Sequence, residues 1–393
     1  MIDELGLAYE EGERGRHRRV PPPKRRRGRS AIAAVLAVLL LGALGGAAYW
    51  GIGRAMDFFA APDYTGGGTD EVVVEVQQGQ TLREIGGTLQ KAGVVKSDKA
   101  FIDAAEDNAR SENIQPGFYK LRKEMRARDA VSLLVNLVNR IVKGVTIREG
   151  LSVIQTYKLL AEKTGIALRE FQAAGKDPAK LGVPDFWFKR TDGKKAAAKP
   201  SLEGFLYPQT YEFPPNAGAA DILKAMVQQF LTAAEEVGFV PTVEKERGGI
   251  SPYEALIVAS LAQVEAGVPG DLGKVARVAY NRAYGGDFPC GCLEMDVTVN
   301  YWLEVNGKPT KASKDMTAAE LDDPRNPYNR KIAGLPPTPI DNPGEAALRA
   351  AMDPPAGNWL YFVAIDKKGN SAFATTLAEH ERNQATARRN GVL

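Results

Sequence analysis

Glu265 is the residue of this sequence best placed to act as a general acid. It ends a segment that begins at residues 251–254 (SPYE), whose serine, proline and glutamate are preferred N-cap, N1 and N3 residues of a helix. Residues 255–264 contain two polar side chains, so we expect this helix to be buried. Burial and the negative end of the helix dipole both raise the pKa of a carboxyl, as acid catalysis near neutral pH requires. From these residues alone, a glutamate that points into water fits equally well.

Residues 201–211 (SLEGFLYPQTY) combine carboxylate, aromatic, glycine and proline residues without helix or strand periodicity. Such a mixture suits sugar recognition, because C–H faces stack on aromatic rings while hydroxyl groups need polar partners. A loop that packs its aromatic side chains into the core is the alternative interpretation.

Metal and nucleophile chemistry have weak support in this sequence. His17 lies in a basic tail and His380 stands alone, so neither a histidine metal centre nor a serine–histidine–aspartate triad is indicated. Cys290 and Cys292 are the only cysteines, and a C-x-C pair without further ligands nearby is a weak zinc motif. The pair could also close as a tight disulfide, so its redox state stays open. We therefore predict no metal and no cofactor.

The N-terminal region indicates how the rest of the chain is held. Residues 1–29, rich in arginine and proline, predict a basic cytoplasmic tail. Residues 30–53 carry no charge and, at about 1.5 Å per residue, are long enough to cross a membrane core of about 30 Å as one helix. The positive-inside rule then predicts a single-pass plasma-membrane protein with a cytoplasmic N-terminus and an extracytoplasmic catalytic domain. A cleaved signal peptide is the competing interpretation.

The charge distribution argues against nucleic acid as a partner. Nine of the 51 basic and five of the 48 acidic residues lie in residues 1–29, so the remainder holds 42 basic and 43 acidic residues. This near-neutral remainder gives no electrostatic reason to bind a phosphate backbone. Topology and anionic lipid account for the basic tail.

Residues 54–70 predict a Gly-rich linker, and residues 71–144 a small α+β subdomain. Its pattern predicts a strand at 72–76, a helix opened by a capping box of Thr81 and Glu84, a second helix from residue 97, a strand at 117–121 and a closing helix at about 129–142. This order and the opening VEVQQGQTLREIG resemble a LysM domain, which implies binding of N-acetylglucosamine-containing glycans. A spacer domain is the alternative.

Residues 145–393 predict a mixed α/β catalytic domain, which makes the whole fold α+β. Its motif series resembles that of the endolytic murein transglycosylases, the YceG-like family, over about residues 72–390. The segments that carry the resemblance are, in order, EGFLYPQTYEF, IVASLAQVEAG, ARVAYNR, LEMDVTVNY, NPYNR, GLPPTPIDNPGEAALRAAMDPP, LYFVA and FATTLAEHERN. The resemblance implies that Glu265 is the catalytic glutamate, although Ala266 and Gly267 stand where a second acidic residue is usual. It also implies a membrane anchor and a LysM-like subdomain before the catalytic domain.

The resemblance implies a membrane-anchored lytic transglycosylase. It would cleave within peptidoglycan strands between N-acetylmuramic acid and N-acetylglucosamine, leave 1,6-anhydro ends and terminate nascent strands, with peptidoglycan synthases or penicillin-binding proteins as candidate partners. A hydrolytic muramidase with Asp296 or Glu203 as second carboxylate is one alternative. A non-catalytic glycan-binding scaffold for cell-wall synthases is another. The candidates for sugar binding, each also open to a structural role, are Glu203, Tyr211, Asn281, Asp296 and Asn329.

Overall fold

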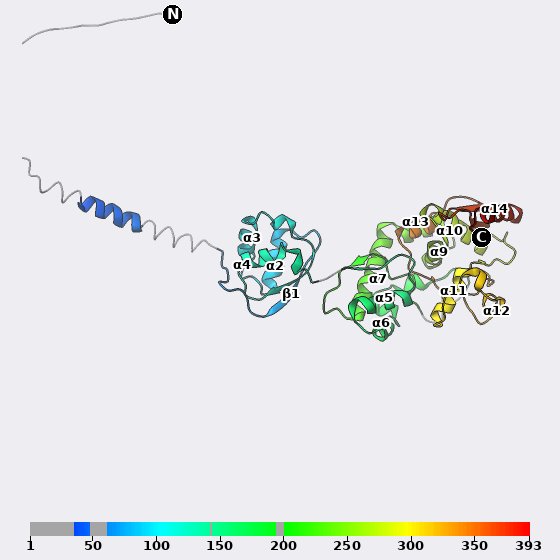
Figure 1. The fold of residues 1–393 in the computed structure, drawn as a ribbon, viewed down its shortest axis with the longest axis horizontal. Helices are drawn as coiled ribbons and strands as arrows, with labels where there is room; N and C mark the ends of the chain where they lie inside the picture. The colour runs from blue at the N-terminus through cyan, green and yellow to red at the C-terminus, as the bar shows by residue number, and fades with distance from the viewer. Residues whose placement is uncertain (1–34, 48–60, 142–143, 194–199) are drawn as a thin grey trace, which may run out of the picture.

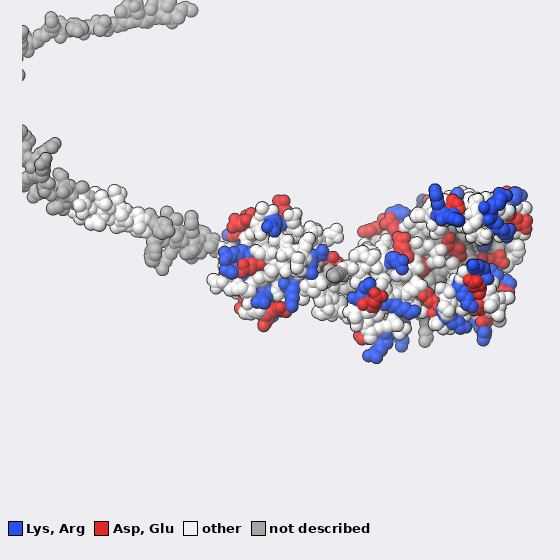
Figure 2. Space-filling model, in the orientation of Figure 1, with Lys and Arg blue, Asp and Glu red and all other residues white. Residues whose placement is uncertain are grey.

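The computed structural model describes residues 35–47, 61–141, 144–193 and 200–393 (Figure 1). The predicted tail at residues 1–29 lies outside these ranges, as do parts of the predicted membrane helix at 30–53 and of the predicted linker at 54–70. Residues 35–47 are helical and carry no charged side chain (Figure 2). Within the described ranges, no helix has both the length and the apolar character needed to cross a membrane.

The first folded part is a two-stranded sheet packed against helices. Its elements are β1 (Glu71–Val76), α2 (Leu82–Lys91), α3 (Asp98–Glu106), the 3-10 helix Ser111–Asn113, β2 (Gly117–Arg122), α4 (Ala127–Leu134) and the 3-10 helix Leu137–Asn139. β1 and β2 pair antiparallel, with Glu71 opposite Arg122. Side chains from the sheet and from all three α-helices share a core that includes Phe101 and Tyr119. The predicted order of strand, helix, helix and strand is present.

Two local signals in this part have different outcomes. The predicted capping box is confirmed, since the Thr81 N–H donates to the Glu84 carboxylate at 2.7 Å and the Glu84 N–H donates to the Thr81 hydroxyl. The predicted helix at 129–142 is wrong beyond Leu134. The side chain of Asn136 accepts a hydrogen bond from the Val138 N–H at 3.2 Å, and such a local turn competes with helical bonding.

The second folded part is mostly helical. Its helices are α5 (Val153–Thr164), α6 (Leu168–Ala174), α7 (Ala219–Glu236), α8 (Phe239–Glu246), α9 (Pro252–Glu265), α10 (Leu272–Tyr284), α11 (Asp296–Val305), α12 (Ala318–Leu321), α13 (Glu345–Met352) and α14 (Leu377–Arg389), with 3-10 helices at Pro178–Leu181, Asp185–Phe188, Pro269–Asp271 and Ser313–Asp315. β3 (Val145–Thr146) pairs with β4 (Thr210–Tyr211), and β5 (Tyr361–Ala364) with β6 (Ser371–Ala374), both antiparallel. Helices combined with antiparallel strands confirm the predicted α+β class.

Helix α9 lies at the centre of the second core. Residues 252–262 are all buried, as the apolar sequence predicts. At the start of the helix, the Ser251 N–H donates to the Glu254 carboxylate at 2.7 Å and the Glu254 N–H donates to Ser251 Oγ at 3.2 Å, which confirms the second predicted capping box. Helices α10 and α13 pack along α9 (Figure 1). Because its start and sides are held in this way, its last residue, Glu265, has a defined position.

Candidate active site

Glu265 lines a cleft of about 530 Å³. The backbone becomes extended at Ala266, so the chain leaves the helix directly after Glu265. Helices α10, α11 and α14 and strand β5 contribute to the walls around it. The other residues that line the cleft are Arg282, Glu294, Met295, Asp296, Val297, Asn300, Ser313, Arg330, Tyr361, Phe362, Leu377, His380 and Gln384.

The surroundings of Glu265 favour its protonated form. Burial is the largest cause and raises the pKa of Glu265 to about 7; Arg282 acts in the opposite direction, and Asp296 adds to the rise. The expectation of a raised pKa at this position is confirmed. With a pKa near the working pH, the same carboxyl can donate a proton and later accept one.

Arg282 of α10 is a fixed cation in the wall of the cleft. Its side chain is 7% exposed, Nε donates to the Leu360 carbonyl at 2.6 Å, and Nη1 donates to the Leu293 carbonyl. The guanidinium lies over the rings of Phe288 and Tyr361, at 4.5 and 5.7 Å from their centroids. Because these contacts hold the charge in place, Arg282 can stabilise the Glu265 carboxylate once the proton has left.

Asp296, a predicted sugar-binding residue and a possible second carboxylate of the muramidase alternative, opens α11 in the same cleft. Its Oδ1 accepts a hydrogen bond from Arg330 Nη1 at 2.9 Å, and both side chains are about a quarter exposed. Arg330 therefore balances the charge of Asp296 next to the acid. Of the predicted sugar-binding residues, Asp296 is the one that the structure brings together with Glu265 in one cleft.

The two predicted asparagines make backbone contacts instead. Asn281 Nδ2 donates to the carbonyls of Gly357 and Trp359 at 3.0 and 2.9 Å, which positions the segment before β5. Asn329 Nδ2 donates to the Asp323 carbonyl at 2.9 Å. Neither asparagine is among the described residues that line the cleft. Sugar binding by them stays a prediction.

Glu203 and Tyr211 lie in the core. Glu203 is 2% exposed and accepts hydrogen bonds from the Val153 N–H at 2.8 Å and the Tyr301 hydroxyl at 2.9 Å. The Tyr211 hydroxyl donates to the Tyr207 carbonyl at 2.6 Å. Neither side chain is among the described residues that line the cleft of Glu265. This placement matches the core-packing interpretation of residues 201–211.

The buried carboxyl of Glu203 predicts a pH-dependent stability. Burial raises the pKa of Glu203 to about 8 from 4.5, so between these values the folded state holds a proton that the unfolded state has released. The contribution to the free energy of unfolding is then full below pH 4.5 and falls, by up to about 4 kcal/mol, as pH rises to 8. We expect Glu203→Gln to flatten the decrease of the thermal midpoint between pH 5 and pH 8. An equally steep decrease in the variant would contradict this origin.

Arg282 and Arg330 of the cleft were not among the predicted site residues, and His380 was interpreted as an isolated histidine. Arg282 follows Val275, Val278 and Ala279 at helical spacing, so an arginine on the buried face of α10 was the available signal. His380 stacks on Tyr361 with ring centroids 5.2 Å apart, and its Nδ1 has no hydrogen-bond partner among the described residues. Burial, assisted by Arg282, lowers the pKa of His380. The cleft wall therefore favours the neutral form of this imidazole.

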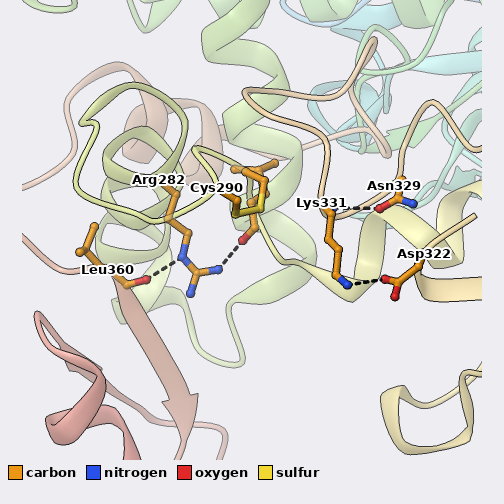
Figure 3. Close-up of a disulfide and its surroundings, with 8 residues drawn as sticks. Arg282, Cys290, Asp322, Asn329, Lys331 and Leu360 are labelled. Carbon is orange, nitrogen blue, oxygen red and sulfur yellow. Dashed lines mark hydrogen bonds and ion pairs between the residues drawn. A yellow bond between two sulfur atoms is a disulfide. The ribbon is translucent and has the colours of Figure 1, made fainter. Parts of the chain in front are cut away.

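Cys290 and Cys292, whose redox state the sequence left open, form a disulfide in the loop between α10 and α11 (Figure 3). Their sulfurs and a carboxylate oxygen of Glu294 lie within 4.8 Å of one another. The disulfide occupies both sulfurs, so this cluster does not offer the two thiolates that a metal ion would need.

The sequence pattern that defines the YceG-like family matches residues 74–386. The chain belongs to the YceG-like family. An endolytic murein transglycosylase of Bacillus subtilis (strain 168) is 31% identical to it over 315 residues, which cover 79% of this chain and 83% of that relative. An endolytic murein transglycosylase of Streptococcus pneumoniae is 25% identical over 331 residues, which cover 80% of this chain and 58% of that relative. A crystal structure of a YceG-like protein from Listeria monocytogenes matches 80% of this chain and 99% of its own, with a TM-score of 0.51 and 25% identity.

This YceG-like chain is therefore an enzyme of the lytic transglycosylase class. Among the described residues, Glu265 of the motif SLAQVEAG is the one that combines a raised pKa, a helix end and a position in the cleft, and its role as the catalytic glutamate stays a prediction. Ala266 and Gly267 follow Glu265 in the chain, so its immediate neighbours add no charge. In this YceG-like cleft, Glu294 and Asp296 of the neighbouring loop and helix supply further carboxylates.

Proposed function

We propose that this enzyme cleaves the bond between N-acetylmuramic acid and N-acetylglucosamine within peptidoglycan strands and leaves a 1,6-anhydro end. The observation that carries the proposal is the position of Glu265, with its raised pKa, in a polar cleft that also holds the fixed cation Arg282. The names of the relatives, endolytic murein transglycosylases, support murein as the substrate and internal bonds as the point of cleavage.

Glu265 serves first as the acid and then as the base. Its proton passes to the glycosidic oxygen, the bond from that oxygen to C1 of the muramic acid breaks, and C1 becomes oxocarbenium-like. The C6 hydroxyl of the same sugar then attacks C1, and its proton returns to the Glu265 carboxylate. The enzyme is regenerated and no water is consumed. An attack within one sugar gains from proximity, which replaces the second carboxylate that hydrolytic glycosidases use.

Arg282 stabilises the carboxylate of Glu265 during the part of the reaction in which it is ionised. A carboxylate in a mostly buried position is unfavourable unless a nearby charge stabilises it, and Arg282 lowers the pKa of Glu265 against the effect of burial. Since carbonyl and aromatic contacts hold the guanidinium, little reorganisation is needed when the charge develops. This arrangement keeps the pKa of Glu265 near neutrality rather than higher.

Product analysis tests the proposal. Purified glycan strands are incubated with the full-length protein in detergent, and the products are identified by mass spectrometry. Anhydro-muramic ends at internal positions would support the proposed reaction. Reducing ends would instead indicate a hydrolytic muramidase, for which Asp296 in the same cleft is the available second carboxylate. Absence of cleavage would favour a glycan-binding scaffold.

The pH profile of cleavage should report the pKa of Glu265. The reaction needs the protonated acid, so the rate should fall as pH rises through about 7 and decrease about tenfold per unit above it. Asp296→Asn removes a charge that raises this pKa and should move the decline to lower pH. Initial rates between pH 5 and pH 9 measure both effects. A rate that is constant from pH 6 to pH 9 would exclude Glu265 as the general acid.

The proposed location of the enzyme is the extracytoplasmic side of the plasma membrane. An uncharged segment at residues 30–53 after a basic tail supports a single-pass anchor in the plasma membrane, with the cleft on the extracytoplasmic side. The strand, helix, helix, strand order of the first folded part supports a LysM-like glycan binder. An anchored enzyme of this kind would terminate nascent strands close to the synthases that make them. Protease protection of residues 61–393 in sealed vesicles tests the orientation.

A further inference from the structure

The loop between α10 and α11 forms one wall of the active-site cleft and carries the Cys290–Cys292 disulfide. Cys290 is exposed, whereas Cys292 is fully buried. The mechanism proposed above uses neither sulfur. The disulfide lies in the same loop as residues that contact Arg282 and the segment of Arg330.

On one side the loop holds Arg282. Leu293, the residue directly after Cys292, accepts a hydrogen bond from Arg282 Nη1, and Figure 3 shows this guanidinium between the loop and Leu360. Phe288, two residues before Cys290, lies against the same guanidinium at 4.5 Å. The disulfide thus lies between two of the contacts that fix the cation beside Glu265.

On the other side the loop holds the segment of Arg330. The Glu294 N–H donates to the Arg330 carbonyl at 2.9 Å, and the Gly334 N–H donates to the Gly291 carbonyl at 2.6 Å. Cys292 also forms an antiparallel β-bridge with residue 333. Arg330 in turn binds Asp296 in the cleft. The five residues from Cys290 to Glu294 therefore join the two arginine-bearing segments.

We propose that the Cys290–Cys292 disulfide is a positioning element of the active site, which fixes Arg282 and Arg330 at the cleft, and that its reduction slows glycan cleavage in the folded enzyme. This inference rests on the proposed function. Without the covalent ring, residues 290–292 gain conformational freedom, and the Leu293 carbonyl is no longer held in one place. Arg282 keeps its hydrogen bond to Leu360 and its contact with Tyr361, whereas its hydrogen bond to Leu293 is weakened.

The redox step requires a dithiol as reductant. A thiolate attacks the exposed Cys290 sulfur, the sulfur–sulfur bond breaks, and the Cys292 sulfur leaves as a thiolate that takes up a proton. The second thiol of the reductant then displaces Cys290 as a thiol. Two electrons and two protons pass from the dithiol to the protein, and the reductant becomes a cyclic disulfide.

Kinetics of the full-length protein in detergent test the proposal. Reduction with dithiothreitol should lower kcat for glycan cleavage roughly tenfold, because small displacements of catalytic groups have large effects on rate, while KM changes less than about twofold. Arg282 lowers the pKa of Glu265, so weaker fixation should move the alkaline decline of the rate to higher pH. Reoxidation should restore both values. The double variant Cys290→Ser/Cys292→Ser should have the kcat and KM of the reduced enzyme, and dithiothreitol should not change them.

A second measurement does not depend on cleavage. Carbon-13 NMR follows the titration of the Glu265 carboxyl in the oxidised and reduced protein, with the signal assigned by its loss in Glu265→Gln. A higher titration midpoint after reduction supports the proposal. Equal midpoints together with equal rates would overturn it, as would a loss of rate that coincides with loss of near-ultraviolet circular dichroism. If the oxidised protein cuts no glycan, the proposed function fails, and the NMR comparison still decides whether the disulfide positions Arg282.

Discussion

Glu265→Gln should lower kcat for glycan cleavage by at least about 10³-fold. General acid catalysis contributes about 10²- to 10⁴-fold, and glutamine can neither donate the proton to the leaving oxygen nor accept it from the C6 hydroxyl. Glutamine has nearly the same shape as the protonated form of this half-buried acid and, like that form, carries no charge. KM should therefore change little. Initial rates with purified glycan strands measure the effect.

Glu294→Gln is the matched control. Glu294 lines the same cleft, and the substitution removes one carboxylate there without touching the end of α9. We expect Glu294→Gln to lower kcat by less than about tenfold, as for a residue without a role in proton transfer. Thermal unfolding of both variants should match the wild type. If Glu265→Gln retains more than a tenth of the wild-type rate, or if both variants lose equal activity, another residue must be the acid.

Asn342→Ala should lower the free energy of unfolding of the second folded part by about 3 kcal/mol or more. Asn342 is fully buried, and its Oδ1 accepts hydrogen bonds from the Gly204 and Leu206 N–H groups at 3.1 and 2.9 Å. Its Nδ2 donates to the Leu151 carbonyl at 2.8 Å. Alanine leaves two buried N–H donors without that acceptor, at about 1–3 kcal/mol each. Urea unfolding followed by tryptophan fluorescence measures the change.

The control for this substitution is Asn306→Ala. Asn306 is exposed and donates to the Trp302 carbonyl at 2.8 Å, so water can replace the lost contact. A surface change of this kind is expected to stay within about 0.5 kcal/mol. Asn342 joins three segments that lie far apart in the chain. If Asn342→Ala lowers the free energy of unfolding as little as Asn306→Ala does, other contacts must hold these segments together.

Local sequence patterns predicted several features whose deciding interactions lie within a few residues of one another. The capping boxes at Thr81 and Ser251 are hydrogen bonds between residues three apart, and both are present as predicted. The apolar run predicted a buried helix, and the helix is buried through Ala262, whereas Val264 is exposed; Glu265 lies at the helix end. The predicted continuation of α4 failed on a similarly local contact, the bond from the Val138 N–H to the Asn136 side chain.

Contacts between residues that lie far apart in the chain could not be predicted from local sequence patterns. Arg282 is fixed by the carbonyl of Leu360, 78 residues away, and Glu203 is bound by Tyr301, 98 residues away. No periodicity links such partners, because their proximity follows from how helices pack and not from spacing along the chain. Amino-acid type therefore made Glu203 and Asp296 equal candidates, whereas packing buried the first in the core and opened the second to the cleft. The position of Glu265 at the end of a helix followed from local sequence, whereas the burial and the neighbouring charges that set its pKa are properties of the assembled fold.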